Sequence, residues 1–131
     1  MIHRRHLLAG AAVSFVLAVP VMGRAAETQT FTQKAFDAAK AAGRPVLVEV
    51  TAPWCPTCKA QRPILSDLLS APKFKDLAVF DVDFDSRKGV LKELGVRMQS
   101  TLIAYKGASE RGRSTGDTDK ASIARLLDKT L

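Results

Sequence analysis

Apolar and polar positions along the chain follow two alternating periods, which predict strands and helices in turn. The segment VLVEV (46–50) is a nearly continuous aliphatic run, as expected of a central strand covered on both faces. In LAVFDVDFD (77–85) apolar and acidic residues alternate, which also predicts a strand. Shorter runs predict a first strand at 28–31 and a hairpin of strands at 101–106 and 111–115.

Helical spacing of apolar residues predicts four helices among these strands. They cover 33–42, about 56–69, 87–95 and a last segment that starts near Asp117–Asp119. Thr32 is expected to cap the first helix, Gly43 to end it, and Pro63 to kink the second helix. The order βαβαβαββα predicts an α/β fold with a central mixed β-sheet and helices on both of its faces.

The first 25 residues differ from the rest of the chain. Arg4 and Arg5 precede an apolar run over 7–21, and no acidic residue occurs before Glu27. This pattern is typical of a secretory signal peptide. The run is shorter than the roughly 20 residues that a spanning helix needs, which disfavours an uncleaved membrane anchor. We therefore expect a cleavable signal peptide at 1–25 and one domain at 26–131, exported by the general secretory or the twin-arginine route.

Removal of the signal peptide changes the charge of the chain. The full chain has a formal net charge of +7, whereas residues 26–131 carry 17 basic and 13 acidic residues, a net charge of +4. The densest basic group, Lys106 with Arg111 and Arg113, is better explained by a solvated strand edge than by a nucleic-acid site. We expect no nucleic-acid partner, and we expect the exported domain to reside in an oxidising compartment, a bacterial periplasm.

Both cysteines of the chain lie in the segment WCPTCK (54–59). A domain of this length needs no disulfide in order to fold, and a disulfide across so short a loop stabilises a fold weakly. At the start of a helix, Cys55 would face unpaired backbone N–H groups and the positive end of the helix dipole, which favour its thiolate. We therefore expect Cys55 to be the exposed nucleophile and Cys58 to be the buried thiol that resolves a mixed disulfide.

Glu49 is the candidate proton acceptor for Cys58. It is the one charged residue in an otherwise aliphatic strand that ends just before the cysteine segment. A buried carboxyl group has a raised pKa, which suits a general base that works near neutral pH. The alternative is that Glu49 lies at the strand end and meets water, but its aliphatic neighbours favour burial.

The sequence resembles the thioredoxin family over nearly all of residues 27–131. The resemblance is carried by VLVEVTAPWCPTCK (46–59), by Pro63 in the following helix, by LGVRMQSTLIAYKG (94–107) and by Gly116 before the last helix. It implies a thioredoxin fold and thiol–disulfide exchange through Cys55 and Cys58, with Glu49 at the buried-acid position of the family. It implies no cofactor besides the redox-active cysteine pair.

Three features depart from the family pattern. Thr101 matches the threonine that follows the family's cis-proline, but the proline position holds Ser100; a cis bond before a non-proline residue costs about 2.5–4 kcal/mol, which favours a trans Gln99–Ser100 bond. The dipeptide between the cysteines is Pro-Thr, neither the Gly-Pro of typical thioredoxins nor the Pro-His of disulfide-introducing oxidases. Asp81 stands where many thioredoxins have a lysine near the buried acid.

Asp81 has two possible arrangements. If it points inward, it couples to Glu49 and one of the two carboxyl groups stays protonated. We expect the other arrangement, in which Asp81 is solvated.

The resemblance also implies where a substrate would bind. In the family, the loop before the threonine faces the disulfide and pairs with the substrate backbone. We therefore expect substrate contacts at the residues around the cysteines and in this loop, namely Trp54, Pro56, Thr57, Ser100 and Thr101. For Trp54, packing that shapes the rim of the site is a simpler explanation than a dedicated binding role.

Three functional hypotheses remain. The first is an exported, monomeric thiol–disulfide oxidoreductase that acts on protein dithiols or disulfides; analogy with periplasmic thioredoxin-like proteins favours reduction, with a membrane thiol carrier as electron donor. The second is a Cu(I) carrier, since two thiolates suit soft Cu(I). Residues 26–131 contain no histidine, no third cysteine and only Met98 as a thioether, which weakens this hypothesis and excludes a structural zinc site. The third is an inert structural disulfide.

Overall fold

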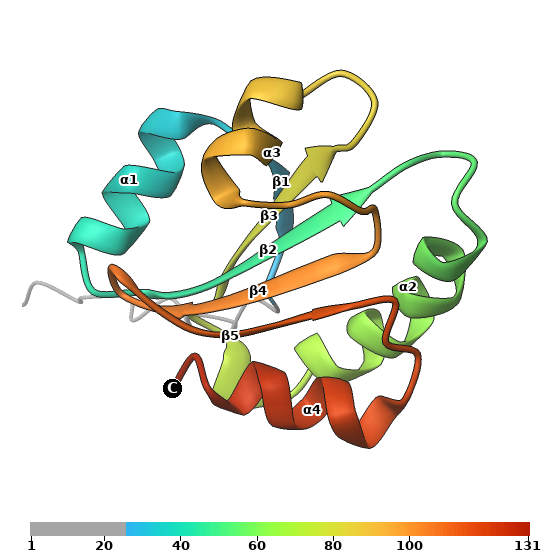
Figure 1. The fold of residues 1–131 in the computed structure, drawn as a ribbon. Coiled ribbons are helices and arrows are strands. Elements are labelled where there is room, and N and C mark those ends of the chain that lie inside the picture. Colours follow the sequence, from blue (N-terminus) through green and yellow to red (C-terminus); the bar gives the residue numbers. More distant parts are fainter. Residues whose placement is uncertain (1–25) are drawn as a thin grey trace, which may run out of the picture.

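A five-stranded mixed sheet with two helices on each face forms the described part of the chain (Figure 1). The computed structural model describes residues 26–131, so the predicted signal peptide at 1–25 lies outside the described residues. The strands are β1 (Thr28–Thr30), β2 (Pro45–Thr51), β3 (Ala78–Asp83), β4 (Thr101–Lys106) and β5 (Ser109–Thr115). The helices are α1 (Gln33–Ala41), α2 (Pro56–Leu69), α3 (Lys88–Leu94) and α4 (Lys120–Asp128). A short 3₁₀ helix η1 (Pro72–Phe74), which the sequence did not predict, follows α2.

The predicted element order and the mixed sheet are both confirmed. The strand order is β1-β3-β2-β4-β5, in which β1, β3 and β2 are parallel, β4 is antiparallel to β2, and β5 is antiparallel to β4. Because β4 runs opposite to β2, the start of β4 lies at the same edge of the sheet as the end of β2. This topology brings the loop before β4 next to the loop that follows β2.

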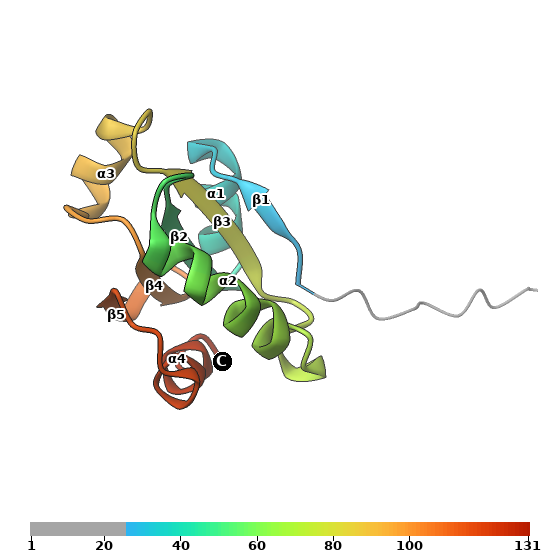
Figure 2. The same cartoon turned by 90° about the vertical axis from the view of Figure 1, so that its right-hand side faces the viewer.

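Alternate residues of β2 face the two cores of the molecule. Val46, Val48 and Val50 pack in the core under α1 and α3, whereas Leu47 packs in the core under α2 and α4. Figures 1 and 2 show these two helix pairs on opposite faces of the sheet. Since side chains alternate along a strand, Glu49 points to the same face as Leu47, which is the face that α2 covers.

Capping residues explain where the helices begin and end. The Thr32 hydroxyl accepts a hydrogen bond from the backbone N–H of Ala35 (3.2 Å), which confirms the predicted cap of α1. Helix α3 ends at Gly95, which adopts φ +67°, a left-handed conformation that favours glycine. Pro63 lies inside α2, as predicted. No helix among residues 26–131 is both long enough and apolar enough to cross a membrane.

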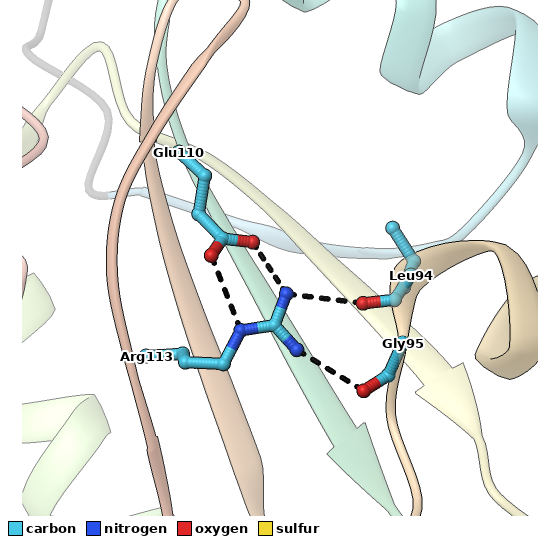
Figure 3. Close-up of polar contacts among 4 residues, drawn as sticks. All are labelled: Leu94, Gly95, Glu110 and Arg113. Atoms are coloured by element: carbon cyan, nitrogen blue, oxygen red, sulfur yellow. Dashed lines mark hydrogen bonds and ion pairs between the residues drawn. The ribbon is translucent and has the colours of Figure 1, made fainter.

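Arg113 ties the β4–β5 hairpin to the end of α3 (Figure 3). Its guanidinium donates to the carbonyl oxygens of Leu94 (3.0 Å) and Gly95 (3.3 Å), which have no partner inside the helix. The same group forms an ion pair with Glu110 through both carboxylate oxygens. Of the basic group predicted at a solvated strand edge, Arg111 and Arg113 lie on edge strand β5 and Lys106 ends β4, but Arg113 is held in a fixed position.

Candidate active site

The cysteine pair lies where the chain passes from β2 into α2. Cys55 and Cys58 are disulfide-bonded, and their Cα atoms are 5.3 Å apart. Cys55 is the N-cap residue of α2 and Pro56 occupies the first helical turn, where its missing N–H leaves no helical hydrogen bond unmade. Phe84, just after β3, packs against the pair. The predicted position of the motif at a helix N-terminus is thus confirmed.

The expected difference in exposure between the two cysteines is wrong. Both side chains are buried, and each residue is only 3% exposed. The difference between them lies in their contacts instead. Cys55 Sγ accepts a hydrogen bond from the backbone N–H of Cys58 (3.1 Å), whereas Cys58 Sγ lies 3.9 Å from the carbonyl oxygen of Val50. A backbone N–H aimed at Cys55 Sγ stabilises a thiolate at that atom.

Cys58 also borders an open cleft of about 370 Å³, whereas Cys55 does not. The cleft runs between the β1 edge of the sheet and α2, and its lining includes Glu49, Asp81 and Arg62. A volume of this size holds several water molecules, since one occupies about 30 Å³. The predicted partners Glu49 and Cys58 are therefore brought to one solvent-connected space.

Glu49 is half-buried in the wall of the cleft rather than lying at a free strand end. The pKa of Glu49 is raised from its ordinary value of 4.5 to about 7, first by its removal from water and second by the negative charge of Asp81. The positive charge of Arg62 and a polar contact from Thr28 act in the opposite direction, with smaller effect. The carboxyl group therefore changes its protonation near neutral pH.

The expectation that Asp81 is solvated is met only in part, because the open cleft that Asp81 lines also contains Glu49. Asp81 is half-buried, lines the same cleft as Glu49, and accepts a hydrogen bond from the Thr51 hydroxyl (2.5 Å). The parallel register of β2 and β3 sets this arrangement, because it pairs residue 49 with residue 81. The two carboxyl groups consequently interact, as the inward alternative requires.

Ser100 has an unusual backbone conformation in the loop before β4. Its φ is +58°, a left-handed value that costs a residue with a Cβ about 1–2 kcal/mol. Residues 26–131 contain no cis peptide bond, so the Gln99–Ser100 bond is trans, as the sequence favours. The Ser100 N–H donates to the carbonyl oxygen of Val50 (2.7 Å), the same oxygen that lies next to Cys58 Sγ. The loop therefore sits against the disulfide.

The other predicted substrate-binding residues fall into two groups. Trp54 is 56% exposed, and its Nε1 donates to Asp85 (2.9 Å), which fixes the indole at the rim of the site. Pro56 is also exposed and Thr57 is half-buried. Thr101 is buried instead, and its hydroxyl bonds the Met98 carbonyl (2.8 Å), so it shapes the loop from inside.

Two residues near the site were not predicted. Met98 is 53% exposed in the loop before β4, where an isolated methionine carries no sequence signal. Gln61 is only 3% exposed and bonds two loops. Its helical spacing could have indicated its burial, because residue 61 falls on the buried stripe of α2 that contains Cys58 and Leu65. A polar residue on an apolar stripe indicates a buried hydrogen-bonding role.

No group of three or more histidine, cysteine, aspartate or glutamate side chains within the described range 26–131 is arranged to hold a metal ion.

A disulfide-bonded C-x-x-C pair, placed where the central strand of a mixed sheet leads into a helix, defines a thiol–disulfide oxidoreductase. The thioredoxin family model matches residues 27–129, and the chain belongs to the thioredoxin family. Thiol–disulfide exchange is accordingly its activity, and proteins of this family act on protein disulfides.

Relatives and solved structures agree with this assignment. The chain is 34% identical over 101 residues to a thioredoxin of Chlamydia trachomatis, covering 77% of this chain and 96% of the relative. It is 33% identical over 96 residues to thioredoxin H4 of Arabidopsis thaliana, covering 72% and 79% of the two chains. The crystal structure of Trxlp from Edwardsiella tarda is similar with a TM-score of 0.75 and 42% identity, covering 77% of this chain and 98% of that one.

Proposed function

We propose that the protein is an exported, monomeric reductant of protein disulfides that works in a bacterial periplasm. In this proposal Cys55 is the nucleophile, Cys58 resolves the mixed disulfide, and Glu49 accepts the proton of Cys58. The observation that carries these roles is the difference in surroundings: Cys55 Sγ is bonded by a backbone N–H, whereas Cys58 borders the cleft that contains Glu49.

The first step of the proposed reaction starts from the dithiol form. The Cys55 thiolate attacks one sulfur of a substrate disulfide, a bond forms between the two sulfurs, and the other substrate sulfur leaves as a thiolate. The hydrogen bond from the Cys58 N–H favours the attacking thiolate, since it stabilises negative charge on Cys55 Sγ.

The second step closes the disulfide of the protein. The Glu49 carboxylate takes the proton of the Cys58 thiol, directly or through one water molecule of the cleft. The Cys58 thiolate then attacks Cys55 Sγ, which releases the second substrate thiolate and forms the Cys55–Cys58 bond. Two electrons have passed to the substrate, and its thiolates take up protons from Glu49 and from water. A membrane thiol carrier returns the protein to the dithiol form, and the cysteine pair serves without a separate cofactor.

Export is supported by the sequence of residues 1–25, with its basic start and apolar run. The family match begins at residue 27, so the preceding segment is additional to the domain. A fusion of residues 1–25 to a reporter protein tests export by cell fractionation. Replacement of Arg4 and Arg5 by lysine separates the routes, because only twin-arginine export requires the arginine pair.

The roles of the cysteines are tested by trapping. The Cys58→Ser protein should accumulate mixed disulfides with protein substrates, since Cys55 attacks and no resolving thiol follows. The Cys55→Ser protein is the matched control and should trap far less. If neither variant traps a partner, the disulfide is structural and inert.

The direction of electron flow is tested by the reduction potential of the pair in glutathione buffers. Potentials of related proteins extend from about −270 mV for reductants to about −120 mV for oxidants. We expect a value near the low end, together with catalysis of insulin reduction. A value near the high end would identify an oxidant of thiols and would contradict the proposed direction.

A further inference from the structure

Gln61 is a buried polar residue that joins three parts of the molecule. It lies on α2, one turn beyond Cys58, and is 3% exposed. Its amide nitrogen donates to two backbone carbonyl oxygens, those of Ser100 (3.2 Å) and Asp117 (2.8 Å). Ser100 belongs to the loop before β4 and Asp117 to the segment between β5 and α4. Both amide hydrogens of Gln61 therefore serve to hold α2 against these two loops.

Ser100 is held by backbone hydrogen bonds as well. Its N–H donates to Val50 O (2.7 Å) at the end of β2, and its carbonyl oxygen accepts from the N–H of Gly116 (3.0 Å). The side-chain bond from Gln61 reaches the same carbonyl oxygen as the Gly116 bond. Of these three hydrogen bonds, only the one from Gln61 comes from a side chain. It is also the only one that comes from the helix that carries the cysteines.

This contact matters because the conformation of Ser100 is not set by the residue itself. A serine at φ +58° is in a region that only glycine adopts freely, and the surrounding structure must hold it there. A proline would fix φ near −65°, but this chain has no proline at position 100. The hydrogen bonds to the Ser100 peptide groups, which come from other segments of the chain, thus hold φ in place of a proline ring.

We infer that Gln61 is a positioning residue for substrate binding, which holds the loop before β4 (98–100) in register with the helix that carries Cys55 and Cys58. The inference rests on the proposed function, the reduction of a protein disulfide, and on the substrate-pairing role that the family resemblance implies for this loop. Gln61 acts through Ser100 and does not itself touch the reacting sulfurs. Its removal should weaken binding of a protein disulfide and leave the cysteine pair unchanged.

The cysteine pair also has contacts that involve neither Gln61 nor the loop before β4. The bond from the Cys58 N–H to Cys55 Sγ lies within the first turn of α2. The two residues also pack against Ala52 and Phe84, neither of which belongs to the loop before β4. A small disulfide that needs no contact with the loop should therefore react normally when the loop has shifted.

The test compares Gln61→Met, which keeps the size of the side chain and removes its donors, with Gln33→Met as matched control. Gln33 is exposed on α1, on the opposite face of the sheet. For Gln61→Met we expect KM for insulin to rise roughly two- to tenfold, the range for loss of the one hydrogen bond that reaches the substrate loop at Ser100, with kcat unchanged. The rate with cystine and the reduction potential should match the wild type. Gln33→Met should change none of these.

A second variant tests whether the effect passes through Ser100. Glycine adopts φ +58° without strain, so the double variant Gln61→Met/Ser100→Gly should recover most of the KM for insulin. Hydrogen exchange at the Ser100 N–H gives a readout that does not depend on turnover. It should become faster in Gln61→Met and remain at the wild-type rate in Gln33→Met.

Three results would overturn the inference: an unchanged KM in a folded Gln61→Met protein, an equal loss of rate with cystine, or a shifted reduction potential. If Gln61→Met does not fold, Gln61→Asn, whose shorter amide cannot reach both carbonyl oxygens, is measured in its place with the same expectation. If the wild-type protein oxidises peptide dithiols instead of reducing insulin, the proposed direction fails. The same KM comparison, made with a reduced peptide, then decides the role of Gln61.

Discussion

Glu49 on β2 and Asp81 on β3 are register partners in neighbouring parallel strands, and both line the cleft beneath α2. Two acidic residues thus share a partly enclosed space next to Cys58. Burial is the main reason that the pKa of Glu49 lies near 7, and the charge of Asp81 is the second. The cleft therefore contains a carboxyl group, that of Glu49, which gains or loses its proton near physiological pH.

Replacement of Asp81 by asparagine should lower the pKa of Glu49. A negative charge nearby disfavours ionisation of Glu49, so its removal favours the carboxylate form. The pKa should nevertheless stay above 4.5, because the larger cause, burial, remains. Carbon NMR of the Glu49 carboxyl group during a pH titration measures the change. Asp37→Asn on α1 is the control, and an equal pKa in wild type and Asp81→Asn would show that the two carboxyl groups do not interact.

Glu49 should make the protein less stable as the pH rises. Its pKa is about 7 in the folded chain and near 4.5 when unfolded, so the fold binds the proton more tightly than the unfolded chain does. The stabilisation is fully present below about pH 4.5 and is lost as the pH rises through about 7; the difference corresponds to about 3 kcal/mol.

Glu49→Gln removes this titration. Relative to wild type, the variant should gain about 3 kcal/mol in free energy of unfolding between pH 4 and pH 8, since glutamine stays neutral at both values. Urea denaturation of the oxidised proteins at the two pH values measures the gain. Glu93→Gln, at an exposed position of α3, should show none. A constant difference between wild type and Glu49→Gln across this range would mean that Glu49 has an ordinary pKa.

Arg113 should stabilise the fold through the geometry of its guanidinium rather than its charge. Arg113→Ala removes the donors to Leu94 O and Gly95 O together with the pair to Glu110, and should cost about 1–2 kcal/mol. Arg113→Lys should cost nearly as much, because a lysine cannot replace the planar set of donors. Thermal unfolding measures both. Arg111→Ala, on the same strand, should stay within about 0.5 kcal/mol of wild type, and full rescue by lysine would contradict the geometric explanation.

Local signals in the sequence were sufficient for most of the fold. Helix α2 was predicted over 56–69 and spans Pro56–Leu69, because its start and its apolar spacing are local properties. The strand pattern of VLVEV likewise placed β2. The position of the cysteine pair at the helix start follows from the same local rules.

Features that depend on packing between distant segments were not predictable in the same way. The burial of Cys55 depends on Phe84, which comes from the segment after β3. The inward position of Asp81 depends on the register between β2 and β3, which no single strand reveals. The conformation of Ser100 depends on the hydrogen bond that it donates to Val50 O and on those that it accepts from Gly116 and Gln61.

The backbone of Ser100 provides a test in which the same substitutions should have opposite effects at two sites. At φ +58° a Cβ is strained, so Ser100→Gly should be more stable than Ser100→Ala by about 1 kcal/mol. Ser66 is exposed inside α2, where glycine is the poorer residue, so there the alanine variant should be the more stable by about 1 kcal/mol. Urea denaturation of the four variants measures both differences. The comparison within each pair cancels the loss of the hydroxyl, including the bond from Ser100 Oγ to Gln99 O (2.6 Å). An advantage for alanine at both positions would show that Ser100 relaxes to an ordinary φ in solution, and the loop would then need no tertiary support.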